Sequence, residues 1–101
     1  MSQNVRSSQR YDVQLSVEVS IGDQKHVSTT RNLSLGGAFM DTDVKPPFNA
    51  RVTLKFSIPN QREPIQVGGV VRWSDPGGFG VQFDGLRARD VWALGKYFEQ
   101  L

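Results

Sequence analysis

Hydrophobic and polar residues alternate with a period of two along most of the chain, and this pattern predicts β-strands. The clearest alternation covers residues 11–21, where every odd position is apolar or aromatic, and it predicts one long half-buried strand. Gly22-Asp23 follows and predicts a two-residue hairpin turn with glycine first. Residues 24–31 are polar but rich in β-branched side chains, as expected of an edge strand or an outward-facing strand.

Shorter stretches of the same alternation predict four more strands, over residues 35–41, 52–58, 65–73 and 79–83. Turn-forming residues separate them, at Pro46-Pro47, Pro59-Asn60 and Asp75-Pro76-Gly77-Gly78. Gly68-Gly69 indicates a bulge or a close approach of the backbone within the fifth strand. Six short strands joined by turns predict an all-β fold, either an antiparallel sandwich or a small closed barrel.

The period changes near the C-terminal end of the chain. Apolar residues there recur every three or four positions, which predicts one face of an α-helix, made of Val91, Leu94, Phe98 and Leu101. Asp84 is a candidate N-cap for this helix, and Gly95 weakens the helix by about 1 kcal/mol relative to alanine. Residues 1–10 are polar and are expected to form a flexible segment, so the folded domain is expected to cover residues 11–101.

Composition limits the classes of protein that the chain can represent. Its 101 residues suit one domain, and an apolar content of 38% with a net charge of +2 excludes a disordered chain. The absence of cysteine excludes disulfides and thiolate metal sites. No apolar run approaches the roughly 18 residues of a membrane helix, and residues 1–10 lack a signal-peptide pattern, so we expect a cytoplasmic protein that does not insert into membranes.

Catalytic and metal-binding chemistry finds little support in the sequence. His26 is the only histidine, lies in a polar strand and is expected to be exposed to solvent. Asp41 and Asp43 flank a loop and are expected to be solvated, and no cluster of metal-ligating residues is present. We therefore expect a protein that is not an enzyme and that holds no metal or cofactor. A net charge of +2 is also too small for an ordinary nucleic-acid binder.

Two short motifs carry the chemistry that the sequence does offer. Arg6 and Arg10 lie four residues apart just before the first strand, where both guanidinium groups can bind one phosphate-bearing anion or stack on a base. Asn32 and Ser34 lie beside a turn and offer hydrogen-bonding groups that suit a guanine edge. Gly36-Gly37 permits a positive φ and a close approach of a flat base to the backbone. Together these groups suit a guanine nucleotide with phosphodiester links.

The same motifs resemble those of the PilZ domain family, the bacterial receptor module for cyclic di-GMP. The family's Arg-x-x-x-Arg motif is matched by Arg6 and Arg10, and its Asp/Asn-x-Ser-x-x-Gly motif is matched by Asn32, Ser34 and Gly37. Residues 80–83, Gly-Val-Gln-Phe, resemble the family's last strand, so the resemblance extends over nearly the whole chain. It implies a six-stranded antiparallel β-barrel followed by a C-terminal helix.

The resemblance also implies a ligand and a role for each motif residue. Arg6 and Arg10 would hold phosphate and stack on guanine, while Asn32, Ser34 and Gly37 would meet a guanine edge. Gly36, next to Gly37, is also a candidate ligand-binding residue. Further candidates for the same face are Arg31, Arg72 and Trp73.

As a function, the resemblance predicts a stand-alone cyclic di-GMP effector. Its N-terminal segment would change conformation on binding and signal to an unidentified partner protein that controls motility, pili, exopolysaccharide or virulence. The protein would be a monomer or a homodimer. The alternatives are a nucleotide-independent interaction module of pilus or motility machinery and, less well supported, a small barrel that binds single-stranded nucleic acid. The latter requires stacking aromatics along a basic groove, but most aromatics here fall on the apolar side of the alternation.

Overall fold

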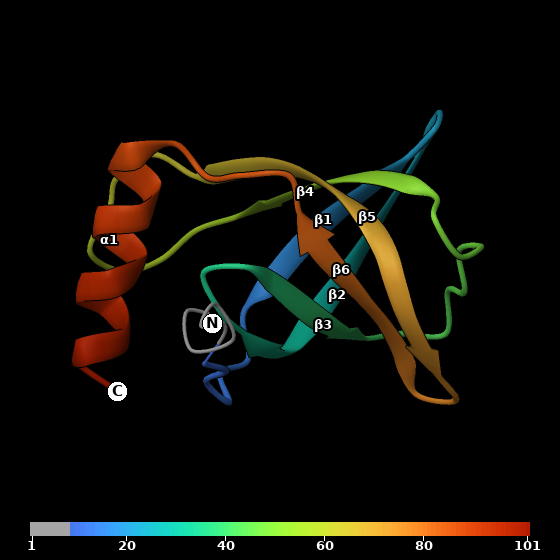
Figure 1. Ribbon diagram of the computed structural model, residues 1–101, viewed down its shortest axis with the longest axis horizontal. Helices are drawn as coiled ribbons and strands as arrows, with labels where there is room; N and C mark the ends of the chain where they lie inside the picture. The colour runs from blue at the N-terminus through green and yellow to red at the C-terminus, as the bar shows by residue number, and fades with distance from the viewer. Residues whose placement is uncertain (1–8) are drawn as a thin grey trace, which may run out of the picture.

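Six β-strands and one α-helix make up the part of the chain that the structure, a computed structural model, describes, residues 9–101 (Figure 1). The elements in chain order are β1 (Ser16–Ile21), β2 (Gln24–Leu33), β3 (Gly37–Asp41), β4 (Arg51–Phe56), β5 (Ile65–Asp75), β6 (Gly78–Phe83) and α1 (Ala88–Glu99). All neighbouring strands are antiparallel, in the order β1-β2-β3-β6-β5-β4, and β4 pairs with β1 to close a barrel. The barrel with a C-terminal helix is therefore confirmed, and the sandwich is not formed.

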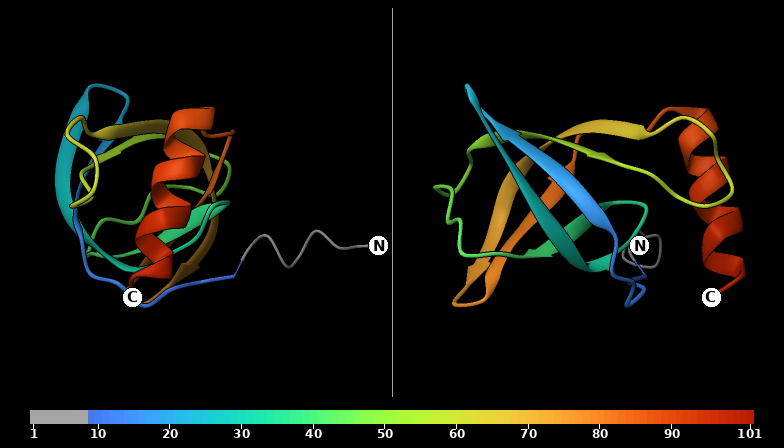
Figure 2. Two further views of the ribbon diagram at one scale, coloured as in Figure 1. Left: turned by 90° about the vertical axis from the view of Figure 1, so that its left-hand side faces the viewer. Right: turned by 180° about the vertical axis from the view of Figure 1, so that it is seen from behind.

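Alternating side chains fill the barrel as the period-two pattern predicts. The inward positions form one apolar cluster that includes Val17, Val19, Leu33, Met40, Leu54, Ile65, Val71, Phe79 and Val81. The helix α1 lies across one open end of the barrel (Figure 2) and adds buried apolar side chains to the same cluster, among them Leu94 and Phe98. In residues 9–101, no helix has the length and apolar character needed to cross a bilayer.

The strand β2 differs from its prediction in two ways. It is not an edge strand, because β1 pairs on one side and β3 on the other, and it continues to Leu33. Its polar residues also do not all face outward, since Ser28 and Thr30 are buried. His26 is half-buried in this strand rather than exposed.

Two β-bulges shift the alternation in β2 and β5. In the β2–β3 pairing Thr30 lies opposite Met40 and Asn32 opposite Phe39, so Arg31 is the extra residue. In the β5–β6 pairing Arg72 is the extra residue in the same way, between Val71 and Trp73. An extra residue reverses the inward and outward positions that follow it, because side chains alternate with a period of two. The bulge in β5 therefore lies at Arg72 and not at Gly68-Gly69. The predicted close approach of two backbones is present at Gly69, where a Cβ would lie 2.6 Å from the Gln82 carbonyl oxygen.

The residues before β1 leave the barrel ladder although their alternation predicts a strand. The strand begins at Ser16, and Tyr11 forms only an isolated bridge with Leu33. Between these points Thr30 holds the chain, through its amide, which donates to the Leu15 carbonyl at 2.9 Å, and through its side chain. Its buried hydroxyl donates to the Val13 carbonyl at 2.6 Å and accepts from the Leu15 amide at 2.8 Å. This pair of bonds fixes the path of the chain towards residue 10.

The helix begins and packs differently from its prediction. Arg87 is the N-cap residue and makes no side-chain capping bond, while Asp84 forms an ion pair with Arg51 instead. Apart from Leu94 and Phe98, the buried face consists of Asp90, Ala93 and Tyr97, and Val91 and Leu101 are exposed. The spacing of apolar residues predicted the helix correctly, but two of the four residues that it assigned to the buried face, Val91 and Leu101, are exposed.

Asp90 is a buried charge that the sequence did not single out, and only 1% of it is exposed. Gln61, Arg87 and Arg89 all donate hydrogen bonds to its carboxylate, at 3.2, 3.2 and 3.4 Å. Burial raises the pKa of Asp90, but the hydrogen bonds from Gln61 and Arg87 and the two arginine charges outweigh burial, so the pKa lies below its ordinary value. Asp90 therefore joins the start of α1 to the β4–β5 loop.

Candidate functional site

A pocket of about 340 Å³ lies where the β2–β3 turn meets β5, β6 and the residue just before Tyr11. Its lining residues are Arg10, Ser34, Gly36, Gly37, Trp73, Gln82 and Phe83. Five of these seven residues were predicted as ligand-binding residues from the sequence: Arg10, Ser34, Gly36, Gly37 and Trp73. The fold thus brings the second half of the arginine motif and the serine-glycine motif to one pocket.

The β2–β3 turn owes its shape to Ser34. Its hydroxyl accepts hydrogen bonds from the Gly36 and Gly37 amides, both at 3.1 Å, and donates to the Gly37 carbonyl at 3.2 Å. Ser34 is itself buried, and its amide also bonds the Gly37 carbonyl. A serine hydroxyl has one donor and two acceptor positions, so this turn uses its full capacity. Ser34 therefore shapes the pocket wall, and ligand contact by its hydroxyl would have to compete with these bonds.

Gly37 is needed for a reason other than the predicted one. Among residues 9–101 the glycines with positive φ are Gly22, in the hairpin turn, and Gly85, so Gly36 and Gly37 do not use the positive φ that glycine permits. Gly37 instead lies so close to β6 that a Cβ on it would collide with the Val81 carbonyl oxygen. The absence of a side chain lets β3 and β6 pair at the floor of the pocket.

Trp73 forms one wall of the pocket because of the bulge at Arg72. The uninterrupted alternation places Trp73 inside the barrel, but the bulge turns it outward, where it is 45% exposed. Its ring lies against Gly80 of the paired strand, where a Cβ would approach the ring to 2.6 Å. The Arg10 guanidinium lies over the same ring, 5.3 Å from its centroid, in a cation–π contact.

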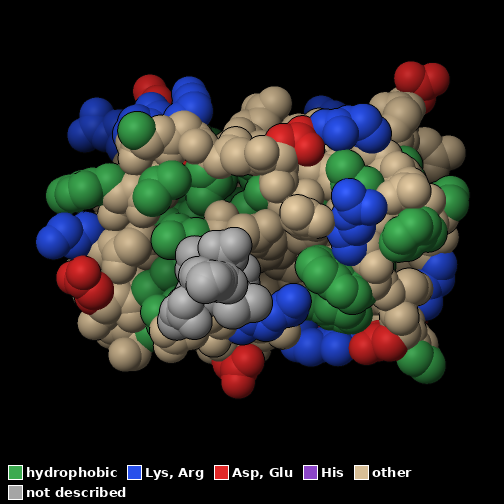
Figure 3. All heavy atoms as spheres, viewed as in Figure 1, with side chains coloured by type: hydrophobic (Ala, Val, Ile, Leu, Met, Phe, Trp, Pro, Cys, Tyr) green, Lys and Arg blue, Asp and Glu red, His purple; other side chains and the backbone are tan. Residues whose placement is uncertain are grey.

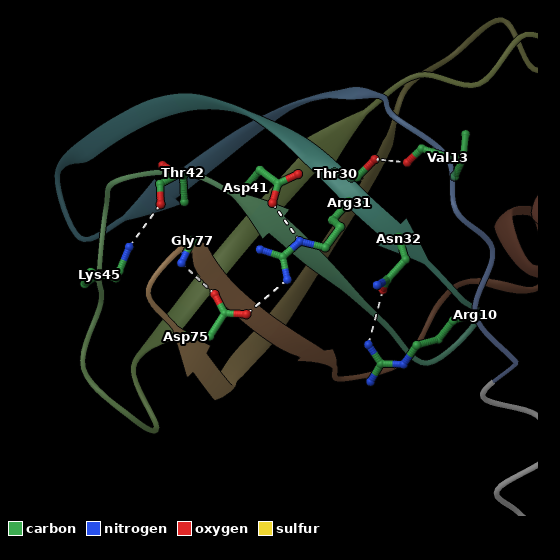
Figure 4. Close-up of polar contacts among 10 residues, drawn as sticks. All are labelled: Arg10, Val13, Thr30, Arg31, Asn32, Asp41, Thr42, Lys45, Asp75 and Gly77. Carbon is green, nitrogen blue, oxygen red and sulfur yellow. Dashed lines mark hydrogen bonds and ion pairs between the residues drawn. The ribbon is translucent and has the colours of Figure 1, made fainter.

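Arg10 is also fixed by Asn32, through a hydrogen bond of 3.2 Å to the side-chain carbonyl oxygen (Figure 4). The bulge at Arg31 directs Asn32 outward, towards Arg10, although Thr30 two residues earlier is buried. Asn32 does not line the pocket itself but borders it through this bond. The predicted residues Arg10, Asn32 and Trp73 therefore form one contact group, from three separate parts of the chain.

The sequence reasoning missed Gln82 and Phe83 as lining residues. Both belong to β6, whose Gly-Val-Gln-Phe segment was recognised only as a strand, and Gln82 is paired with Gly37. Arg72 donates to the Gln82 side-chain oxygen at 3.1 Å and to the Asn49 side-chain oxygen at 2.9 Å. Arg72 thus acts on the pocket indirectly, by holding Gln82. Gln82 can be found from the pairing of β3 with β6, because it lies directly opposite Gly37 of the glycine motif.

Arg31 lies away from the pocket, contrary to its place among the candidates. It donates to Asp41 at 2.7 Å and to Asp75 at 3.0 Å, and lies 4.2 Å from the centroid of the Phe39 ring (Figure 4). Hydrogen bonds to Asp75 and Asp41 raise the pKa of Arg31, and the bond from Arg31 lowers the pKa of Asp75. Asp41, expected to be solvated, is therefore an ion-pair partner. These contacts tie β2 and β3 to the β5–β6 hairpin.

The remaining candidate, Arg6, falls outside the described residues. Two larger hollows, of about 450 and 490 Å³, lie elsewhere around Lys55 and Pro64 and contain no motif residue. Within residues 9–101, no three His, Asp or Glu side chains come together in a metal-binding arrangement. On the face shown in Figure 3, Lys and Arg side chains lie beside exposed hydrophobic ones.

Comparison with known proteins explains why these motifs converge. The sequence model of the PilZ domain matches residues 4–100. The chain belongs to the PilZ family. PilZ domains take cyclic di-GMP as a ligand and not as a cofactor. No curated protein sequence is significantly similar to this PilZ chain.

Solved structures share the fold at low sequence identity. The inhibitor of motility MotI/DgrA of Bacillus subtilis has a TM-score of 0.77 at 20% identity, over 96% of this chain and 49% of its own. The PilZ domain of CeSA from a cellulose-synthesizing bacterium has a TM-score of 0.70 at 16% identity, over 92% of this chain and 98% of its own. PlzA of Borreliella burgdorferi, in complex with c-di-GMP, has a TM-score of 0.65 at 18% identity, over 97% of this chain and 38% of its own. This PilZ chain therefore spans about half the length of MotI/DgrA.

Proposed function

We propose that this PilZ domain is a non-enzymatic receptor that binds cyclic di-GMP in the pocket beside the β2–β3 turn. The observation that carries the proposal is the convergence of Arg10, Asn32 and the Ser34–Gly37 turn on one pocket with an exposed tryptophan wall. These groups supply a cation for phosphate, an amide for a guanine edge and a flat surface for a base. The family match, and the c-di-GMP bound to PlzA, support the same ligand.

Each residue has a role that follows from its contacts. Arg10 binds phosphate or stacks on guanine, and Arg6 is assigned to the same task by its motif spacing. Asn32 hydrogen-bonds the guanine edge. The turn formed by Ser34, Gly36 and Gly37 shapes the wall, and Trp73 is the surface on which a base stacks.

Arg10 lies at the edge of the pocket, near its proposed ligand position. Its bond to Asn32 and its contact with Trp73 restrict the side chain before binding. Binding therefore replaces one hydrogen bond between exposed side chains with bonds to a charged phosphate, which are stronger. Less conformational entropy is lost than for an arginine that is unrestrained in the free state.

We further propose that binding changes the conformation before Tyr11 and that a partner protein reads the change. Tyr11 follows Arg10 directly, is bonded to Leu33 in both directions and stacks on Phe98 of α1 with ring centroids 4.1 Å apart. Exchange of the Arg10–Asn32 bond for bonds to ligand can thus affect the packing of α1 through one aromatic contact. Because MotI/DgrA is an inhibitor of motility, the shared fold favours motility as the controlled process, alongside pili, exopolysaccharide and virulence. The cytoplasmic location stays a prediction from the sequence.

The alternative is a nucleotide-independent interaction module with the same fold. Calorimetric titration with cyclic di-GMP separates the two, with GTP, cyclic GMP and a short oligonucleotide as controls. We expect binding at micromolar concentration or tighter for cyclic di-GMP alone. No heat of binding for cyclic di-GMP at 100 μM protein selects the interaction module.

The site assignment has its own variant and control. Arg10→Ala removes charge-assisted hydrogen bonds worth about 1.5–3 kcal/mol, so affinity should fall at least about tenfold. Arg62→Ala removes the same charge from an exposed residue of the β4–β5 loop that does not line the pocket, and should keep the affinity of the unchanged protein. Equal affinities of both variants would show that the pocket is not the binding site.

A further inference from the structure

The outward face of α1 carries apolar surface that the barrel does not cover. The helix buries one face against the barrel, and Trp92 on the opposite face is 65% exposed, with Val91 beside it 40% exposed. Trp92 is therefore among the most exposed large apolar residues of the part of the chain that the structure describes. Large aromatic residues in this position typically serve as anchors in protein contacts.

Gly95, one turn after Val91, adds a second observation on this face. Glycine is unfavourable inside a helix, so its presence there calls for a reason such as a close contact. A Cβ on Gly95 would meet nothing within 4 Å, so packing within the described chain does not require the glycine. The projecting Trp92 side chain thus lies next to Gly95, which has no side chain. A second helix can pack closely against such a surface.

We propose that this face joins two copies of the chain, with their α1 helices antiparallel. The two helices have complementary charges in a single register. Residues 89 and 99, and likewise residues 92 and 96, are symmetric about position 94. One antiparallel arrangement with its two-fold axis at that level therefore places Arg89 against Glu99 of the second copy and Trp92 against Lys96 of the second copy. Because the dimer has two-fold symmetry, each of these two contacts occurs twice in the interface.

The side chains needed for these contacts are accessible in the single chain. Arg89, Lys96 and Glu99 have side chains 44, 50 and 71% exposed. Lys96 lies 5.7 Å from the Trp92 ring centroid within the chain, so a lysine can lie over this exposed ring. Glu99, 3.9 Å from Lys96, and Arg89, which pairs with Glu63 and Asp90, keep enough exposed surface to meet across the two copies. The face carries both signs of charge, which suits a second copy better than a membrane surface or a strongly charged partner.

The first test measures association against concentration by sedimentation velocity. We expect the protein to pass from monomer to dimer as concentration rises, because one helix face is a small interface. Trp92→Glu should raise the dimer dissociation constant at least tenfold. Phe48→Glu changes an equally exposed residue, 66% exposed in the β3–β4 loop, and should leave the constant unchanged. A protein that stays monomeric up to 1 mM, or equal effects of the two variants, would overturn the proposal.

The second test examines the register. Arg89→Glu alone places acidic residues opposite one another in its homodimer, and Glu99→Arg alone places basic residues opposite one another. Each variant alone should therefore be mainly monomeric, whereas a mixture of the two restores both ionic contacts and should form a heterodimer. Thermal melts check that both variants are folded, because Arg89 also contacts Glu63 and Asp90. Two folded variants that remain monomeric when mixed would show that this register is wrong.

Discussion

Replacing Thr30 with valine tests how the chain is held on its way to the pocket. Valine matches the shape of threonine but has no hydroxyl, so the Val13 carbonyl loses its 2.6 Å donor and the Leu15 amide loses its 2.8 Å acceptor. Thr30 is buried, and each orphaned buried group costs about 1–3 kcal/mol. The Leu15 amide is only partly buried, so it falls at the low end of that range. The expected loss in the free energy of unfolding is therefore about 2–4 kcal/mol.

Urea denaturation and thermal unfolding both measure this loss. For a domain of this size, about 4–8 °C of Tm corresponds to 1 kcal/mol, so the Tm should fall by roughly 8–32 °C. The slope of the urea transition should stay the same, because the amount of surface exposed on unfolding does not change.

Thr29→Val is the matched control. It makes the same chemical change at the neighbouring exposed position, and it should stay within about 0.5 kcal/mol of the unchanged protein. If Thr30→Val is as stable as Thr29→Val, the two hydrogen bonds do not hold the segment and the reasoning is wrong.

Three further predictions follow from contacts at the pocket and at α1. Ser34→Ala should lower the free energy of unfolding, measured by urea denaturation, by about 1–2 kcal/mol, because the Gly36 and Gly37 amides lose their acceptor. Unchanged stability would mean that the turn does not depend on the hydroxyl. Asp90 has a lowered pKa in the folded state, so its carboxylate stabilises the fold fully above about pH 4–5 and this contribution is lost as the pH falls through the folded pKa. Asp90→Asn should therefore flatten the fall of Tm in acid, and an unchanged pH profile would contradict this assignment. Hydrogen exchange should show new protection of the amides before Tyr11 on addition of cyclic di-GMP. The Tyr11 amide is already bonded to Leu33, so its exchange should change little. No new protection at saturating ligand would argue against ordering of the N-terminal segment.

The sequence predicted the strands well where a strict alternation meets one apolar interior. Residues 52–58 and 79–83 follow this rule, and their strands were found within about two residues. The alternation of residues 11–15 misled the prediction, because this segment has only scattered backbone bonds to β2, at Tyr11 and Leu15, and the Thr30 side chain supplies the bonds between them. A side chain that takes the place of a strand leaves no trace in the period of the neighbouring segment.

The site was predicted through its motifs more than through its geometry. The bulges at Arg31 and Arg72 decide which side chains face outward, and period-two reasoning has no signal for a single extra residue. Trp73 illustrates the difficulty, since its alternation places it in the core while the structure places it in the pocket. Arg31, a candidate because it precedes Asn32, does not line the pocket and pairs with Asp41 and Asp75, because adjacency to the motif in sequence does not mean adjacency to the pocket in space.

Closure of the barrel by the β4–β1 pairing limits how a partner protein can recognise this domain. An open sheet presents unpaired amides and carbonyls, to which an extended peptide can add as a further strand. Here the six strands form a continuous ring, so peptide addition would first require a strand to be displaced. A partner that binds the barrel itself must therefore contact side chains on its outer surface or its loops. The same closure removes a common template for aggregation through exposed strands, which allows the outer face of the barrel to vary in sequence without that risk.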